Sequence, residues 1–345
     1  MSKMKIMNHT LRTLILLPAF AAILAASCTK SAGEGANVAI KRQFDAWRSI
    51  HYPDAVEKNG IYIIEDTPGT GASWSKDSTV IVTFMTYTIR SLEGTVNSNT
   101  DEQWAKQLGT WDQTHYYGQQ VVLIGEGYSY AGMDIMLEGM RQGGTRTAII
   151  PSWLMTRDRH DTMDEYLETE TDVSSMIYSI TFLGQTKDLK KYEDQQILDY
   201  STQHLGVTDT LETGAVYLKS YTVYENEPAE MPTDTTVYID YIGRRIIDGQ
   251  VFDTTIADTA KFYHIYNPSK KYAPVEITWA EKAEDIKLSG NSTVSGFALG
   301  LKAMHAGEKV SFVFGYNLGY GSSGSGDMIP AYAALRFDVE MVPEP

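Results

Sequence analysis

The side chains best suited to chemistry in this sequence are aromatic rings in its C-terminal half, accompanied by a few polar groups. They lie in several short segments and comprise Tyr241, Phe252, Asp253, Phe297, Tyr320 and Phe337. Neither the metalloprotease spacing H-E-x-x-H nor the hydrolase elbow G-x-S-x-G occurs. A single cysteine, Cys28, excludes a cysteine-based zinc cluster. We therefore expect no metal site and no cofactor, and an aromatic site instead.

Three segments carry these rings in a specific order. They are YIDYIGRRIIDGQVFDTT (238–255), VSGFALGLKAMHAGEKVSFVFG (294–315) and LGYGSSGSGDMIPAYAALRFDVEMV (318–342). Their order and spacing resemble the FKBP-type (immunophilin) peptidyl-prolyl cis-trans isomerases. The resemblance covers most of the second half and implies an antiparallel sheet wrapped around one short helix.

The resemblance also assigns roles to individual residues. By position, the proline pocket would be lined by Tyr241, Phe252, Val294, Phe297, Tyr320, Ile329 and Phe337. Asp253 and the Tyr320 hydroxyl would be the polar contacts, and Tyr320 would hold a substrate carbonyl. Met328 and Ile329 would bind substrate from the loop that covers the pocket.

An aromatic pocket suits proline isomerisation on physical grounds. Amide resonance gives the X-Pro bond a barrier of about 18–20 kcal/mol. The transition state is twisted and loses the charge separation between nitrogen and oxygen. A water-poor apolar pocket therefore favours the twisted form, and no covalent step is needed.

An insertion departs from the family pattern. Forty residues separate Asp253 from Val294, about twice the family's usual spacing, and residues 256–290 form the insertion. Its aromatic residues are Phe262, Tyr263, Tyr266, Tyr272 and Trp279. One pocket ring should come from this stretch. The insertion could extend a peptide-binding surface or cover the pocket. A non-catalytic polypeptide-binding or chaperone-like protein is therefore an alternative function. A purely structural envelope protein is a third.

The elements that must position these residues occur twice along the chain. Amphipathic helices are predicted at 38–51 and 189–204, and shorter helices at 132–144 and 296–308. Alternating strands are predicted in pairs at 59–67 and 213–221, 78–89 and 235–243, 145–151 and 309–315, and 174–184 and 333–342. Alternation with turns between strands indicates antiparallel sheets. The sequence thus predicts an α+β protein with two FKBP-like domains, 38–185 and 186–345, each opening with a short helix.

The first half is the more divergent copy. Tyr87 takes the place of Tyr241, Met133 that of Phe297 and Tyr178 that of Phe337. Asn97 and Ser98 stand in place of the Phe-Asp pair, and Trp153, Leu154 and Met155 replace the Tyr320 segment. Without the aromatic wall and the polar contacts, proline selectivity should be lost. We expect residues 38–185 to fold without catalysing.

The N-terminal sequence predicts a targeting signal. Lys3, Lys5 and Arg12 precede a 13-residue apolar run, 14–26, and small residues lead to Cys28. The run is too short to span a membrane, and the pattern resembles a bacterial lipoprotein signal. It implies removal of residues 1–27, a lipid on Cys28 and a tether over 28–37; an ordinary secretory signal is the alternative. We expect a lipid-anchored protein of the bacterial cell envelope, periplasmic or surface-facing.

The net charge of the chain limits the classes of partner that we expect. Lys and Arg number 29 against 44 Asp and Glu, a formal net charge of −15. Nucleic-acid binding depends on clustered basic residues and is therefore not expected. The expected partners are proline-containing polypeptides and, through the anchor, a membrane. The sequence predicts no oligomeric state.

Overall fold

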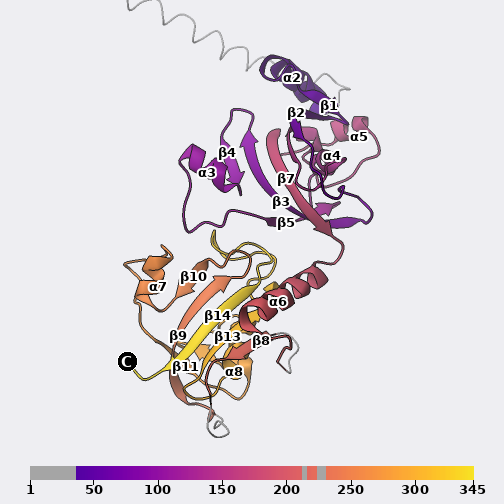
Figure 1. Ribbon diagram of the computed structural model, residues 1–345. Helices are drawn as coiled ribbons and strands as arrows, with labels where there is room; N and C mark the ends of the chain where they lie inside the picture. The colour runs from indigo at the N-terminus through magenta and orange to yellow at the C-terminus, as the bar shows by residue number, and fades with distance from the viewer. Residues whose placement is uncertain (1–35, 212–215, 224–230) are drawn as a thin grey trace, which may run out of the picture. The chain divides into compact units, whose positions relative to one another are not determined.

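The computed structural model describes residues 36–211, 216–223 and 231–345. The predicted signal peptide, Cys28 and the tether up to residue 35 lie outside the described residues. Within the described chain the protein is α+β, with two antiparallel seven-stranded sheets (Figure 1). No helix in this described part is both long enough and apolar enough to cross a membrane.

The chain forms two compact units. The smaller, in its described part, comprises residues 36–53 and 160–172, and the larger comprises 54–159 and 173–345. Helix α2 (Ala36–His51) contacts α5 (Met163–Glu168) in the smaller unit. There the Asn37 side-chain amide donates to the Tyr166 carbonyl oxygen at 3.2 Å. The predicted boundary between two domains near residue 186 stays a prediction.

The first sheet has the strand order β1-β2-β6-β7-β3-β4, with β5 paired to β3. Its strands are β1 (Val56–Lys58), β2 (Ile61–Thr67), β3 (Val80–Ser91), β4 (Val96–Asn99), β5 (Gln120–Gly125), β6 (Thr145–Ile150) and β7 (Met176–Thr186). Helix α4 (Ala131–Leu137) contacts β2, β5 and β6. Helix α3 (Glu102–Leu108) and the 3-10 turn η1 (Ser152–Leu154) lie in the connections.

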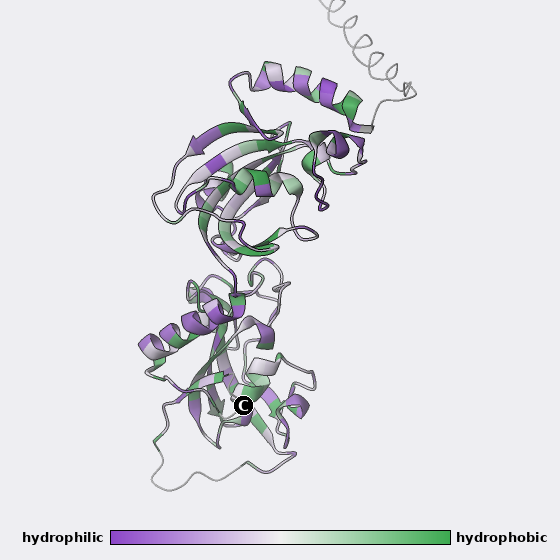
Figure 2. Ribbon diagram, turned by 90° about the vertical axis from the view of Figure 1, so that its right-hand side faces the viewer, coloured by the Kyte–Doolittle hydropathy of each residue, from purple (hydrophilic) through white to green (hydrophobic). Residues whose placement is uncertain are grey.

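The second sheet repeats this plan. Its order is β12-β11-β9-β14-β13-β8, with β10 paired to β9. The strands are β8 (Val216–Ser220), β9 (Thr236–Arg245), β10 (Val251–Thr254), β11 (Val275–Thr278), β12 (Lys287–Leu288), β13 (Lys309–Phe314) and β14 (Leu335–Val342). Burial alternates along β9 and β14. Figure 2 shows hydrophilic and hydrophobic residues interspersed along the strands of the chain. Helix α6 (Leu189–Leu205) opens this half and contacts β8 and β13.

The predicted strands and long helices are confirmed, but the two short helices are shorter than predicted. Helix α4 ends at Leu137 and α8 (Ser295–Lys302) ends at Lys302, about six residues early. In the turns that follow, Gly139 has φ 74° and Gly307 has φ 70°. Glycine adopts such left-handed backbone without strain.

The insertion is partly regular structure. It contains α7 (Ala257–Phe262), β11, the 3-10 turn η2 (Ala283–Asp285) and β12. Strand β11 pairs with β9 along Val275–Thr278 and so widens the second sheet. The remaining 3-10 turn, η3 (Tyr316–Leu318), precedes the Tyr320 loop.

A buried carboxylate on α6 should make stability depend on pH. Glu193 is 4% exposed, and its Oε1 accepts from the Tyr316 backbone N–H at 2.7 Å. Burial raises the pKa of Glu193 from 4.5 to about 7. Since the folded state holds this proton more tightly than the unfolded state, stability falls as pH rises from about 4.5 to about 7. Glu193→Gln should therefore stabilise the protein at pH 8 by up to about 2 kcal/mol and change little at pH 5.

Urea unfolding at the two pH values measures this difference. Asp194→Asn is the matched control, because the Asp194 side chain is 54% exposed on the same helix. Because this variant keeps Glu193, its stability should still fall between pH 5 and pH 8. An equal stability change for Glu193→Gln at both pH values would contradict the assignment.

Candidate functional site

Four of the predicted rings meet between β9, β10, β14 and α8. Phe297 and Phe337 have ring centroids 4.6 Å apart, and Tyr241 meets Phe297 edge to face at 5.7 Å. Phe252 meets Phe337 edge to face at 5.7 Å and 84°. Tyr241, Phe297 and Phe337 are buried, whereas Phe252 is half-buried. The ring cluster, as we call these four residues, is therefore closed at one side and accessible at Phe252.

Two further rings, missed from the sequence, support the cluster. Phe314 stacks on Phe337 at 5.8 Å and 9°, and Phe312 stacks on it at 6.0 Å and 24°. Both come from β13 and are fully buried. Their spacing of two in VSFVF places them on one face of the strand, which is the signal that could have found them.

A carboxylate at the edge of the ring cluster is held from three sides. The Tyr241 hydroxyl donates to Asp253 Oδ2 at 2.6 Å, and the Thr254 N–H donates to Oδ1 at 2.9 Å. Lys270 forms an ion pair with the same carboxylate. Burial, and then the charge of Asp253, raises the pKa of Tyr241, so its hydroxyl remains a donor at neutral pH. Sequence reasoning missed Lys270.

Tyr320 lies at the accessible side of the site. The residue is 36% exposed, and the side chain of Asp253 is 39% exposed. Burial, followed by the charge of Asp253, raises the pKa of Tyr320 as well. Its hydroxyl is therefore a neutral donor that solvent and a peptide can reach. Its contact with a substrate carbonyl stays a prediction.

A glycine and a β-bulge make room for the Phe252 ring. Asp253 pairs with Gly243 of β9, and the register shifts between Val251 and Asp253, which places Phe252 in the bulge. A Cβ at Gly243 would lie 2.8 Å from Phe337 Cε1 and 2.9 Å from Phe252 Cζ. Any larger residue at 243 would therefore push on both rings.

The covering loop is fixed to β9 by a buried arginine. Arg245 is 3% exposed, donates to the Met328 carbonyl oxygen and pairs with Asp248. Ile329 is buried at 4% exposure, and its backbone N–H donates to the Ser325 carbonyl oxygen at 3.2 Å. The core cluster that contains Phe297 and Phe337 also contains Ile329, with Val294 and Met328 packed against it.

The insertion contributes one ring to this core and exposes others. Trp279 is 2% exposed and belongs to the same core cluster as Tyr241. Phe262 and Tyr266 are 75% and 45% exposed. The expectation that one ring of the insertion lines the pocket stays a prediction.

Strand register relates the two halves residue by residue. In the second sheet, Gly243 faces Asp253 on one side and Phe337 on the other. In the first sheet, Ile89 faces Ser98 and Tyr178 in the same way. A register shift places Asn97 where Phe252 lies. At these positions the register agrees with the correspondence of Tyr178 to Phe337 and of Asn97 and Ser98 to the Phe-Asp pair, and Ile89 adds a side chain where the second sheet has none.

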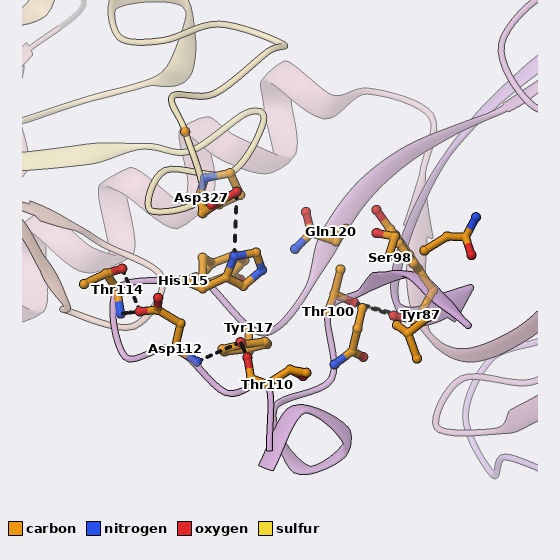
Figure 3. A pocket seen from close by; sticks show the side chains of 16 residues that line it. Tyr87, Ser98, Thr100, Thr110, Asp112, Thr114, His115, Tyr117, Gln120 and Asp327 are labelled. Carbon is orange, nitrogen blue, oxygen red and sulfur yellow. Dashed lines mark hydrogen bonds and ion pairs between the residues drawn. The ribbon is translucent and has the colours of Figure 1, made fainter. Parts of the chain in front are cut away.

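The corresponding region of the first sheet is polar. Beside β4, the hollow in Figure 3 is lined on this side by Tyr87, Ser98, Thr100, Thr110, Asp112, Thr114 and Tyr117. Thr100 Oγ1 donates to the Tyr87 carbonyl oxygen at 3.2 Å, and Asp112 Oδ1 accepts from the Thr114 hydroxyl at 2.8 Å. Asn97 and Ser98 therefore stand where the second sheet carries Phe252 and Asp253, whereas Tyr87 and Tyr178 keep a ring at the positions of Tyr241 and Phe337.

Comparison with known protein families concerns the second half. Residues 227–342 match the family model described as FKBP-type peptidyl-prolyl cis-trans isomerase. The second half therefore contains an FKBP-type domain.

Relatives match over limited stretches of the chain. A probable FKBP-type peptidyl-prolyl cis-trans isomerase of Haemophilus influenzae is 27% identical over 107 residues, which cover 31% of this chain and 34% of that protein. The macrophage infectivity potentiator of Trypanosoma cruzi is 34% identical over 62 residues, covering 18% of this chain and 32% of that protein. FK506-binding protein 2 of Candida glabrata is 29% identical over 106 residues, which cover 31% of this chain and 62% of that protein. The chain thus spans about a third of the first two relatives and less than two thirds of the third.

Solved structures were also matched. The three FKBP domains of wheat FKBP73 align at 16% identity and a TM-score of 0.29, covering 82% of this chain and 94% of that one. A peptidyl-prolyl cis-trans isomerase of Pseudomonas syringae aligns at 18% identity and a TM-score of 0.30, and the alignment covers 46% of this chain and 97% of that one.

Proposed function

We propose that this protein catalyses cis-trans isomerisation of X-Pro bonds in polypeptides and that the ring cluster of the second sheet is its active site. The observation that carries the proposal is the packing of Tyr241, Phe252, Phe297 and Phe337 beside the Asp253 carboxylate, within the segment that matches the isomerase family.

The chemistry follows from the polarity of the cluster. A proline ring placed against Phe252 and Phe297 leaves water, and the twisted amide needs less solvation than the planar one. The Tyr241–Asp253 hydrogen bond fixes the polar edge, and Tyr320 offers a donor for a peptide carbonyl. These groups orient the peptide, and the apolar rings favour the twisted bond.

The cellular setting is part of the same proposal. The pattern from Lys3 to Cys28 supports a lipid anchor in the bacterial cell envelope, where exported proteins fold. Uncatalysed X-Pro isomerisation takes tens to hundreds of seconds and is slow enough to limit folding. We propose that the anchored protein accelerates this step for exported polypeptides.

A matched pair of variants tests where the activity lies. Phe252→Ala removes one edge-to-face ring pair, a loss of about 1 kcal/mol, and should lower kcat/KM for an X-Pro tetrapeptide about fivefold. Asn97→Ala changes the equivalent bulge of the first sheet and should leave kcat/KM unchanged. If the two variants changed kcat/KM equally, or if neither changed it, the assignment of the activity to the second sheet would be wrong.

A polypeptide-binding protein without catalysis is the second candidate. The exposed rings of Phe262 and Tyr266 on the insertion favour it, because exposed aromatic side chains commonly bind partners. Saturable peptide binding with an unchanged isomerisation rate would select this candidate.

A further inference from the structure

A second hollow adjoins the ring cluster and is built largely by the insertion. It encloses about 360 Å³. Phe252, Asp253 and Met328 line it from the site, and Tyr266, Lys270 and Tyr272 line it from the insertion. Because Phe252 and Asp253 belong both to the site and to this hollow, a peptide with its proline against the rings would continue into it.

The insertion side of this hollow is an ordered stack. Tyr266 and Tyr272 lie face to face, with ring centroids 5.1 Å apart at 13°. Lys261 Nζ lies 5.5 Å from the Tyr266 ring centroid, and Lys270 Nζ lies 5.5 Å from that of Tyr272. The Tyr272 hydroxyl accepts from the Asn267 N–H at 2.9 Å. Cation–π and stacking contacts of this kind hold the side chains in place.

The charge of the hollow differs from that of the whole protein. The chain carries a formal charge of −15, yet residues 256–273 contain three lysines and one aspartate. Lys270 is half-buried and pairs with Asp253. Its ammonium therefore offsets the one carboxylate that a bound peptide would meet at the junction of hollow and ring cluster. An acidic residue beside the proline would then meet no net negative charge.

We propose that this hollow is a subsite for the residues flanking a substrate proline and that Lys270 makes it accept acidic side chains. The inference rests on the proposed function, since it concerns the substrates of the same site. Lys270 acts through charge: without it, Asp253 repels a neighbouring glutamate and the subsite selects against acidic sequences.

Two isosteric peptides isolate the effect of charge. One carries glutamate on both sides of a single proline and the other carries glutamine, and both are assayed for Kd and for kcat/KM with the full chain. The preference is the ratio of affinity, or of kcat/KM, for the Glu peptide to that for the Gln peptide. At low salt, Lys270→Met should lower this ratio about fivefold by both readouts, because the Asp253 carboxylate then meets the peptide glutamate at a partly exposed site. High salt should shrink the difference.

Three further variants separate charge from structure. Lys270→Arg should keep the preference. Lys271→Met removes an exposed lysine of the neighbouring position, outside the hollow, and should keep it as well. The double variant Lys270→Met/Asp253→Asn removes both charges and should restore the preference that Lys270→Met lowers.

The outcomes distinguish the two proposals. An unchanged preference in Lys270→Met, or an equal loss in Lys271→Met, overturns the role of Lys270 while catalysis stands. Peptide binding without catalysis overturns the proposed isomerase, and the ratio of Kd values still decides the role of Lys270. Binding of neither peptide overturns both.

Discussion

Replacing Gly243 with valine should lower kcat/KM for X-Pro peptides about thirtyfold. A Cβ at this position would already lie 2.8 Å from Phe337 Cε1 and 2.9 Å from Phe252 Cζ. The valine must displace the Phe252 ring, which is half-buried and can swing toward solvent. Overpacking and loss of the ring pair amount to about 2 kcal/mol in the transition state, which is about thirtyfold in rate. Exchange NMR on an X-Pro peptide measures the rate.

The mirror variant in the first sheet provides the control. Ile89→Gly empties the equivalent strand position, opposite Ser98 and Tyr178. It should cost some stability and leave kcat/KM unchanged, because the first sheet lacks the ring cluster. A rate in Gly243→Val within twofold of the natural protein would contradict the role of the glycine.

Replacing Phe337 with alanine should cost about 3–5 kcal/mol of stability, the range for truncating a buried phenylalanine. Its ring packs against five others, those of Tyr241, Phe252, Phe297, Phe312 and Phe314. Only 5% of Phe337 is exposed, so a cavity would remain at the centre of the cluster. Hydrogen exchange of the β9 and β14 amides under native conditions measures the loss locally.

Phe262→Ala is the matched control for this prediction. Phe262 is 75% exposed, and its truncation should change stability by less than about 0.5 kcal/mol. A loss below 1 kcal/mol in Phe337→Ala would show that the ring is not part of a tightly packed core.

The sequence predicts the sheets well because local patterns encode them. In β14, the alternation LRFDVEMV buries Leu335, Phe337 and Val339 and leaves the intervening side chains more accessible. The same alternation fixes which rings enter the cluster. Helix ends are predicted less well, since the apolar spacing continues to the buried Met304 although α8 ends at Lys302.

Lys270 shows what sequence patterns cannot supply. It lies beside Lys271 in the segment SKK, and nothing local distinguishes the two. Only the path of the insertion brings Lys270 to Asp253 and leaves Lys271 exposed. Gly243 did carry a signal, because glycine inside a strand often marks a close approach by other atoms. The atoms concerned, the Phe252 and Phe337 rings, depend on the strand register.

The most direct test is the isomerisation rate of an X-Pro peptide with the full chain, measured by exchange NMR at substoichiometric protein. We expect cis and trans signals that exchange over tens to hundreds of seconds alone to exchange much faster with the protein. The acceleration should fall in Gly243→Val and persist in Ile89→Gly. An exchange rate equal to that of the free peptide, with the protein folded, would contradict the proposed catalysis.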